Sequence, residues 1–485
     1  NAMDKASISV RADHWLNESV LWKSLLSYAN LDTEMPGSLN ESDYHSRPGY
    51  SYQTFTYRDV EALRVSTGFE GELNAGGKSS ATLYYRDNTT HQLPSYLIFN
   101  TSATSASGRT TENSFTSLGA SAYHRQQWER FKLTLGGLLE QSPNQQKEQN
   151  LAIARDASGR YVAYTRGSVR RDYQVDLGNQ ALFADAAYAI ADGWALNAGL
   201  RYDRVVYDFS NHLSPSATTG AASQTQNFAH LSPKLGLTWD AGQLFVYSNY
   251  SQGFTPPEVS ALFSSAVAPN LSSATYDQYE LGLRYSPLAT LKVDASLYRL
   301  QGQDTLVNYS FAPGLSVARN AGKTQHQGVE LGLNWAATPQ WHVALAGQYA
   351  RHTYLQYRPS PLENYAGQDI PVAPSWQGTL EVAYRPMSHT RIALESVYLG
   401  PYWMDNPNTI EYAGHTLFNL RGEYQLKNLT LWANVSNLLD RAYAEVAMSS
   451  YKGQGRHNGN TQDSYSPGAP RSIAMGLSYA FGGAR

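Results

Sequence analysis

The chain of 485 residues contains no cysteine. This absence excludes a disulfide scaffold, a cysteine-ligated metal and a thiol nucleophile, and it is compatible with passage through the oxidising periplasm. No stretch approaches the roughly 18 uninterrupted apolar residues that a membrane-spanning helix needs. The start of the chain also lacks a charged-then-apolar signal segment, and Asn1-Ala2-Met3 looks like a remnant of an expression vector. We therefore expect no helical membrane protein.

Chemical motifs are missing as well. The chain has no G-x-S-x-G elbow, no H-E-x-x-H pair and no phosphate-binding loop, and its 12 histidines are scattered. A formal net charge of -3 gives no reason to expect nucleic acid as a partner. The sequence predicts no enzyme, no resident metal and no covalently bound cofactor, with a Ser–His pair assembled across strands as the one enzymatic alternative.

What is present is an alternation of apolar and polar residues. In the last segment the apolar positions are Ile473, Met475, Leu477, Tyr479 and Phe481. A period of two is that of a β-strand, whose successive side chains point to opposite faces. The same alternation recurs in 196–202, 279–285, 329–335, 380–384 and 429–435. A soluble sandwich alternates in this way too, so the pattern leaves both all-β classes open.

The connections between these segments favour a membrane barrel. Short links at 74–78, 191–193, 240–243, 286–290, 336–340 and 425–428 alternate with long polar connections at 32–57, 88–112, 141–177, 209–225, 253–274, 355–373, 401–413 and 440–469. Loops this long are uncommon in compact soluble domains. Short turns on one side and long loops on the other are typical of bacterial outer-membrane barrels.

Aromatic residues at strand ends support the same fold. Their amphipathic rings prefer the interface between membrane and water. The predicted interfacial residues are Trp194, Tyr285, Trp335, Trp376, Tyr384, Tyr424, Tyr479 and Phe481. Because lipid offers no hydrogen-bond partners, only a closed sheet satisfies every backbone group there.

The strand count is incomplete for such a barrel. Counting back from the C-terminus gives about 19 strands, whereas bacterial single-chain barrels have even numbers. The first segment, 7–14, runs downward from the outside into a turn at 15–18. We expect residues 1–3 to be vector-derived and 4–485 to be a barrel domain of the 22-stranded plugged type, without its plug and about three strands.

Several motifs, in order, resemble the barrel of TonB-dependent receptors. These are Tyr247 to Phe254 followed by Pro256-Pro257-Glu258, Arg319-Asn320-Ala321-Gly322-Lys323-Thr324 with Gly328-Val329-Glu330, Gly367-Gln368-Asp369, Asn419-Leu420-Arg421, Asn437-Leu438-Leu439-Asp440-Arg441, and Pro467-Gly468 with Pro470-Arg471 before the terminal strand. Met35-Pro36-Gly37 is also similar to an early loop of the ferric-siderophore receptor type, although a Pro-Gly turn has a purely geometric explanation.

The resemblance implies a monomeric, multi-pass receptor of the Gram-negative outer membrane, in contact with its lipid. It implies energy-coupled uptake of a scarce ligand, most often a ferric siderophore or other iron chelate, driven by TonB through a plug. Two alternatives remain: a passive channel that lacks a plug, and a surface receptor or adhesin that uses its loops alone.

Candidate ligand contacts lie in the predicted outer loops. Aromatic and basic loop residues suit a chelate with catecholate or carboxylate arms. The candidates are Arg351, His352, Tyr354, Tyr402, Trp403, Asp405, Arg456 and His457. The competing interpretation places Tyr402 and Trp403 in an interfacial girdle and leaves Arg456 solvated.

A second set of charged residues is predicted to face the lumen or a plug. It consists of Arg201, Glu280, Arg284, Glu330, Glu381, Arg421 and Glu423. We expect these side chains to form a structural network between neighbouring strands more than to bind a ligand.

Overall fold

A computed structural model describes residues 2–312, 315–449 and 463–481. Its main element is an antiparallel sheet of twenty strands, one of which, β5 (Phe99–Asn100), is only two residues long. The predicted all-β class is confirmed, and the nineteen other strands match the predicted number. In the described part of the chain no helix is both long enough and apolar enough to cross a membrane.

The long strands follow one another in chain order. They are β1 (Met3–Trp15), β2 (Val20–Glu34), β3 (Tyr57–Asn74), β4 (Gly77–Leu93), β6 (Ser105–Gln127), β7 (Phe131–Arg155), β8 (Tyr161–Ala191), β9 (Trp194–Asn211), β10 (Gln224–Asp240), β11 (Leu244–Thr255), β12 (Ala274–Leu288), β13 (Leu291–Ala312), β14 (Leu315–Ala336), β15 (Trp341–Gln356), β16 (Trp376–Tyr384), β17 (Thr390–Leu399), β20 (His415–Leu426), β21 (Leu429–Ser436) and β24 (Ser472–Tyr479).

Smaller elements lie in the connections. Two short hairpins pair β18 (Tyr402–Trp403) with β19 (Glu411–Tyr412), and β22 (Ala444–Ser449) with β23 (Asp463–Pro467). The helices are α1 (Glu41–Ser46), the 3-10 turn η1 (Ser95–Leu97) and α2 (Val259–Phe263).

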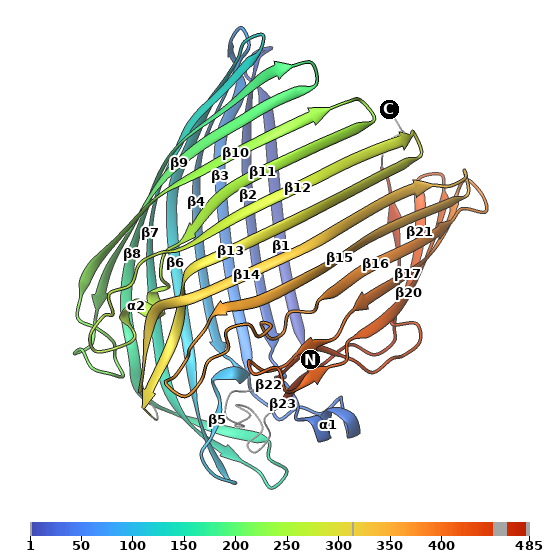
Figure 1. Ribbon diagram of the computed structural model, residues 1–485. Coiled ribbons are helices and arrows are strands. Elements are labelled where there is room, and N and C mark those ends of the chain that lie inside the picture. Colours follow the sequence, from blue (N-terminus) through green and yellow to red (C-terminus); the bar gives the residue numbers. More distant parts are fainter. Residues whose placement is uncertain (1, 313–314, 450–462, 482–485) are drawn as a thin grey trace.

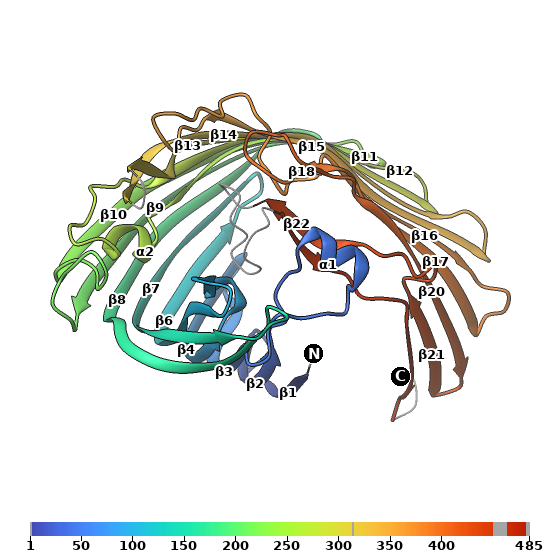
Figure 2. The ribbon, with the colours of Figure 1, turned by 90° about the horizontal axis from the view of Figure 1, so that it is seen from below.

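The sheet curls into an incomplete cylinder (Figure 2). Each long strand pairs with the next along the chain, and among the described residues β1 pairs only with β2 and β24 only with β21. Both edge strands run from the long-loop end to the short-turn end, so they are parallel to each other. An antiparallel closure therefore requires an odd number of strands between them.

Short turns lie at one end of the cylinder, and long loops with α1, β22 and β23 lie at the other (Figure 1). The six predicted short links all fall between paired neighbours. The predicted loop at 141–177 is wrong, because β7 continues to Arg155 and β8 begins at Tyr161. This hairpin projects far beyond the 9–11 residues that cross a bilayer, so lipid imposes no alternation on its strands, and apolar residues such as Leu151 and Tyr161 pack against other loops instead. The predicted loop at 88–112 shrinks for the same reason, since β4 runs to Leu93 and β6 starts at Ser105.

The two faces of the sheet differ as the alternation predicts. Large apolar side chains such as Leu182, Leu281 and Ile473 are exposed on the outer face, where lipid is the expected solvent. Charged and polar residues occupy the positions between them. Such a surface is explained by an apolar environment outside and a wet lumen inside.

Interfacial aromatics gather mainly at the short-turn end. All eight predicted residues are exposed, and neighbouring rings contact one another, for example Trp194 with Trp239 at 5.8 Å and Trp341 with Tyr384 at 4.6 Å between centroids. Trp376 differs, because it begins β16 at the long-loop end. A belt at the short-turn end fits the boundary between lipid and periplasm.

Candidate ligand-binding mouth

The long loops pack around a hydrophobic core of their own, which we call the mouth core. It joins loops that are far apart in sequence, and Figure 2 shows α1 and β22 close together across the open end. Such burial gives the loops a fixed structure, since apolar contacts offset the entropy of ordering them. Its residues are Leu39, Tyr44, Tyr52, Leu93, Ile98, Ala106, Leu151, Ile153, Tyr161, Tyr402, Met404, Tyr412, Ala444, Ala447 and Tyr465.

The β2–β3 loop is tied to the β22–β23 hairpin through this core. Leu39 and Tyr465 exchange two backbone hydrogen bonds of 2.8 Å, and the ring of Tyr44 stacks on that of Tyr465 at 4.8 Å. The same loop also reaches the tip of the β7–β8 hairpin, where the Tyr161 N–H donates to the Tyr52 carbonyl over 2.9 Å. The loop thus links strands near one edge of the sheet to the segment that precedes the other edge.

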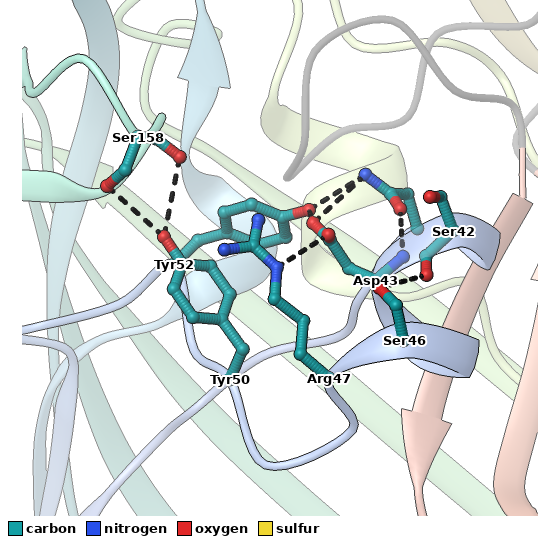
Figure 3. A network of polar contacts seen from close by, with 8 residues as sticks. Ser42, Asp43, Ser46, Arg47, Tyr50, Tyr52 and Ser158 are labelled. Atoms are coloured by element: carbon teal, nitrogen blue, oxygen red, sulfur yellow. Dashed lines mark hydrogen bonds and ion pairs between the residues drawn. The ribbon is translucent and has the colours of Figure 1, made fainter.

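A polar network fixes α1 within this loop (Figure 3). Asn40 caps the helix by accepting from the Asp43 N–H at 2.7 Å, and Asp43 accepts from Arg47 Nε at 2.7 Å and from the Tyr52 hydroxyl. The hydrogen bond from Arg47 is the main reason that the pKa of Asp43 lies below its ordinary value. Burial, followed by the bond to Asp43, raises the pKa of Tyr52. Asp43 is therefore the acceptor that joins the helix to the core.

The predicted contacts of the 401–413 loop are part of this folded mouth. Tyr402 is buried, and its hydroxyl accepts from the Ala447 N–H at 2.8 Å. Asp405 closes the β18–β19 turn by accepting from the N–H groups of Thr409 and Ile410. The Trp403 carbonyl accepts from the Val372 N–H at 2.8 Å. The polar atoms of Tyr402 and Asp405 are thus engaged within the protein.

The predicted contacts of β15 lie against the same region. Arg351 Nε donates to Asp369 at 3.0 Å, and the Tyr354 hydroxyl donates to Asn406 at 3.1 Å. His352 faces His326 across the strand pair, with their Nδ1 atoms 2.8 Å apart. Tyr354 thus contacts the 401–413 loop directly, and Arg351 reaches it through Asp369, whose backbone exchanges hydrogen bonds with the Asn408 side chain. Arg456 and His457 lie outside the described residues.

The predicted lumen residues mostly contact partners on neighbouring strands. Arg421 pairs with Glu395 at 3.1 Å, and Arg284 approaches Asp294 at 3.5 Å. The other contacts are Glu381 with Arg391 at 2.5 Å, Glu280 with the Tyr247 hydroxyl at 2.7 Å, Glu330 with Ser296 at 3.4 Å, and Arg201 with Asp203 of its own strand at 2.7 Å. Glu423 lies on the same face of β20 as Arg421. These contacts are separate pairs spread along the wall, and the structural role expected for these residues stays a prediction.

Sequence reasoning missed the mouth core. Its partners lie hundreds of residues apart, as Leu39 and Tyr465 do, so no local period connects them. The many tyrosines of the long loops were a signal, but aromatic loop residues such as Tyr402 were assigned to ligand contact or to an interfacial girdle rather than to packing between loops. Tyr44, Tyr52, Tyr161 and Tyr465 are all buried here.

Known proteins share this sequence pattern and fold. The family model described as "TonB dependent receptor-like, beta-barrel" matches residues 8–438. A ferrioxamine receptor of Yersinia enterocolitica is 27% identical over 267 residues, which cover 53% of this chain and 35% of that protein. A probable TonB-dependent siderophore receptor, PiuA of Acinetobacter baumannii, is 22% identical over 313 residues, covering 59% and 40%. The chain thus matches less than half the length of these relatives.

The solved structures support the fold. The crystal structure of the unliganded ferric citrate transporter FecA superposes with a TM-score of 0.79 at 17% identity, covering 98% of this chain and 70% of that one. At this identity the similarity concerns the fold. Together with the family match over most of the chain, it shows that this chain belongs to the TonB-dependent receptor-like β-barrel family.

Proposed function

We propose that the chain forms the wall and outer mouth of a receptor that imports an iron chelate across the outer membrane. The observation that carries the proposal is the combination of an apolar outer face, a charged inner face and a folded mouth on one sheet. The sequence relatives, named as receptors for ferrioxamine and a siderophore, favour an iron complex as the ligand.

In this proposal the wall supplies shape and selectivity and carries out no covalent chemistry. The mouth core holds the loops in place, so that a ligand meets an ordered surface and less binding energy is spent on ordering loops. Separate ion pairs and hydrogen bonds along the lumen, such as Arg421 with Glu395, support the wall. Transport, in this proposal, depends on TonB acting on a plug. The plug is proposed and not described, because the match to each relative spans only part of that relative's length.

The proposed location is the Gram-negative outer membrane, with lipid around the apolar face and the loops outside the cell. The short-turn end faces the periplasm, as it does in bacterial barrels. The proposed state is a monomer.

The test is uptake by living cells. A deletion strain carrying the gene on a plasmid should accumulate radioactive iron from at least one member of a panel of ferric chelates, and should lose this uptake when TonB is absent. Uptake that persists without TonB, with steady conductance of the purified protein in planar bilayers, would favour the passive channel. If deletion of the gene changes neither uptake nor growth, a role in transport is contradicted.

A further inference from the structure

A groove of about 630 Å³ opens on the outer face of the wall, across β11, β12 and β13. These strands lie side by side (Figure 1). Ser248 forms the low point of the groove, because it stands in one cross-strand row between Leu237 and Leu281. A serine side chain is much shorter than a leucine side chain, so the surface dips at this position.

The groove faces the apolar side of the wall. Leu237, Leu281 and Leu297 line it and are exposed on the outer face. Leu297 lies six positions beyond Leu291, the first residue of β13 at the short-turn end. A strand needs 9–11 residues to cross a bilayer, so the groove lies within the half of the lipid band that is nearer the long loops. Acyl chains are therefore the solvent that meets it.

An arginine stands at the upper end of the groove. Arg299 lies two positions beyond Leu297 and therefore on the same face of β13. It is eight positions from Leu291, which places it where the lipid band ends. A long side chain at this height can hold its charged end among the lipid head groups.

The charge of Arg299 is not balanced within the protein. Its Nη2 donates to Gln325 Oε1 at 2.8 Å, and it forms no ion pair with the described residues. Arg351 lies in the same row, two strands further along the sheet, and pairs with Asp369 at 3.0 Å. The two arginines thus differ: Arg351 has an internal counter-ion, whereas Arg299 offers its charge to the surroundings.

Two tyrosines border the groove beside Arg299. The rings of Tyr250 and Tyr279 contact each other at 5.1 Å between centroids, and Tyr279 is directly opposite Arg299 in the strand register. The nearby carboxylate of Asp277 accepts from the Tyr250 hydroxyl at 2.9 Å and from Gln252 at 2.8 Å. Tyrosine rings are typical of the boundary between lipid and water, so they mark the same height as Arg299.

We propose that this groove binds one anionic lipid, with an acyl chain over Ser248 and the lipid phosphate on Arg299. A chain that fills the dip gains dispersion contacts that a flat wall does not offer. A guanidinium group matches a phosphate in geometry and can form two parallel hydrogen bonds with it. Charge and shape thus select the same partner, since the apolar groove and the unbalanced arginine adjoin each other.

The test is native mass spectrometry of the purified full chain, released from detergent after removal of the lipids that copurify with it. The probes are dioleoylphosphatidylglycerol, which is anionic, and dioleoylphosphatidylcholine, which has the same chains and no net charge. Glycerol 3-phosphate is the third probe, because it carries the phosphate without a chain. We expect the anionic lipid to bind more tightly than both other probes, and its advantage over the neutral lipid to shrink as salt is added.

Two variants separate the contributions of charge and shape. Arg299→Gln should weaken binding of the anionic lipid on the order of tenfold and leave the neutral lipid unchanged, with Arg160→Gln in the β7–β8 turn as its control. Ser248→Phe fills the groove and should weaken binding of both lipids, with Val65→Phe on the outer face of β3 as its control. Both substituted side chains are exposed, so the unfolding temperature without lipid should stay the same.

Three results would overturn the inference. They are equal binding of the two lipids by the unaltered protein, an undiminished preference for the anionic lipid in Arg299→Gln, or binding of glycerol 3-phosphate as tight as that of the anionic lipid. The last result would make Arg299 a contact for simple anions only. None of these outcomes depends on whether cells import a chelate, so the lipid contact and the proposed function can fail separately.

Discussion

The contact between Leu39 and the β22–β23 hairpin allows a quantitative prediction. Leu39 is 1% exposed in the mouth core, and its backbone exchanges two hydrogen bonds with Tyr465. Replacing a buried leucine by alanine costs about 2–5 kcal/mol, since transfer free energy is lost and a cavity remains. We expect Leu39→Ala to destabilise this contact by at least the lower value.

The effect should be local. A loss of about 2 kcal/mol raises the equilibrium constant for opening about 30-fold. The membrane-crossing strands keep their backbone hydrogen bonds to neighbouring strands, so only the loops should open more often. Hydrogen exchange followed by mass spectrometry measures this directly at the amides of residues 39 and 465, with peptides of β12 and β13 as an internal reference.

A matched control is available in another loop. Leu362 is 96% exposed in the β15–β16 loop, so Leu362→Ala should leave exchange unchanged. If Leu39→Ala accelerates exchange at residues 39 and 465 by less than about threefold, or accelerates it equally in β12 and β13, then the mouth core does not hold the loops together and the argument is wrong.

Three further predictions concern other parts of the molecule. The pKa of Asp43 is lowered chiefly by Arg47. The ionised carboxylate therefore contributes its full stabilisation above the unfolded pKa of about 3.9, and this stabilisation is lost as the pH falls through the lower folded pKa. Proteolysis of the 41–52 segment should increase as the pH falls through that range, and Asp43→Asn should already be cleaved faster at pH 7. Leu380→Arg on the outer face of β16 should destabilise the protein by about 2–4 kcal/mol in urea titrations in lipid vesicles, whereas Thr379→Arg, on the lumen face beside Glu381, should cost much less; equal losses would contradict the assignment of faces. Glu381 and Arg391 form a half-buried pair, so a double-mutant cycle with glutamine at both positions should give a coupling energy of about 1 kcal/mol with unchanged ligand affinity, and altered affinity would instead indicate ligand contact.

The barrel wall could be predicted from sequence because its physics is local. Lipid on one side and water on the other impose a period of two on each strand, and the turn between neighbouring strands is short at one end. For that reason the segment from Ile473 to Tyr479 and the links such as 240–243 were predicted correctly. The failure at 141–177 has the same cause, because that hairpin extends beyond the lipid and its buried residues pack against distant loops, so no period of two is imposed on it.

The predicted ligand residues show where this reasoning ends. Tyr402 and Asp405 were chosen because their side chains suit a chelate, and Arg351 because it is basic. The structure gives each of them an internal partner: Ala447, Thr409 and Asp369 respectively. Whether they also contact a ligand stays a prediction. The type of a loop residue shows which hydrogen bonds its side chain can form, but not which of them it already forms within the protein.

The sequence by itself determined the membrane-crossing part of the strands, the faces of that part and the family, because each depends on neighbours within a few positions. Only the tertiary structure decided that distant loops share the mouth core and that the β7–β8 hairpin extends through 141–177. These features depend on the curvature of the sheet and on contacts between residues far apart along the chain. No local pattern encodes such contacts, because they arise only when the strands have taken their places around the cylinder.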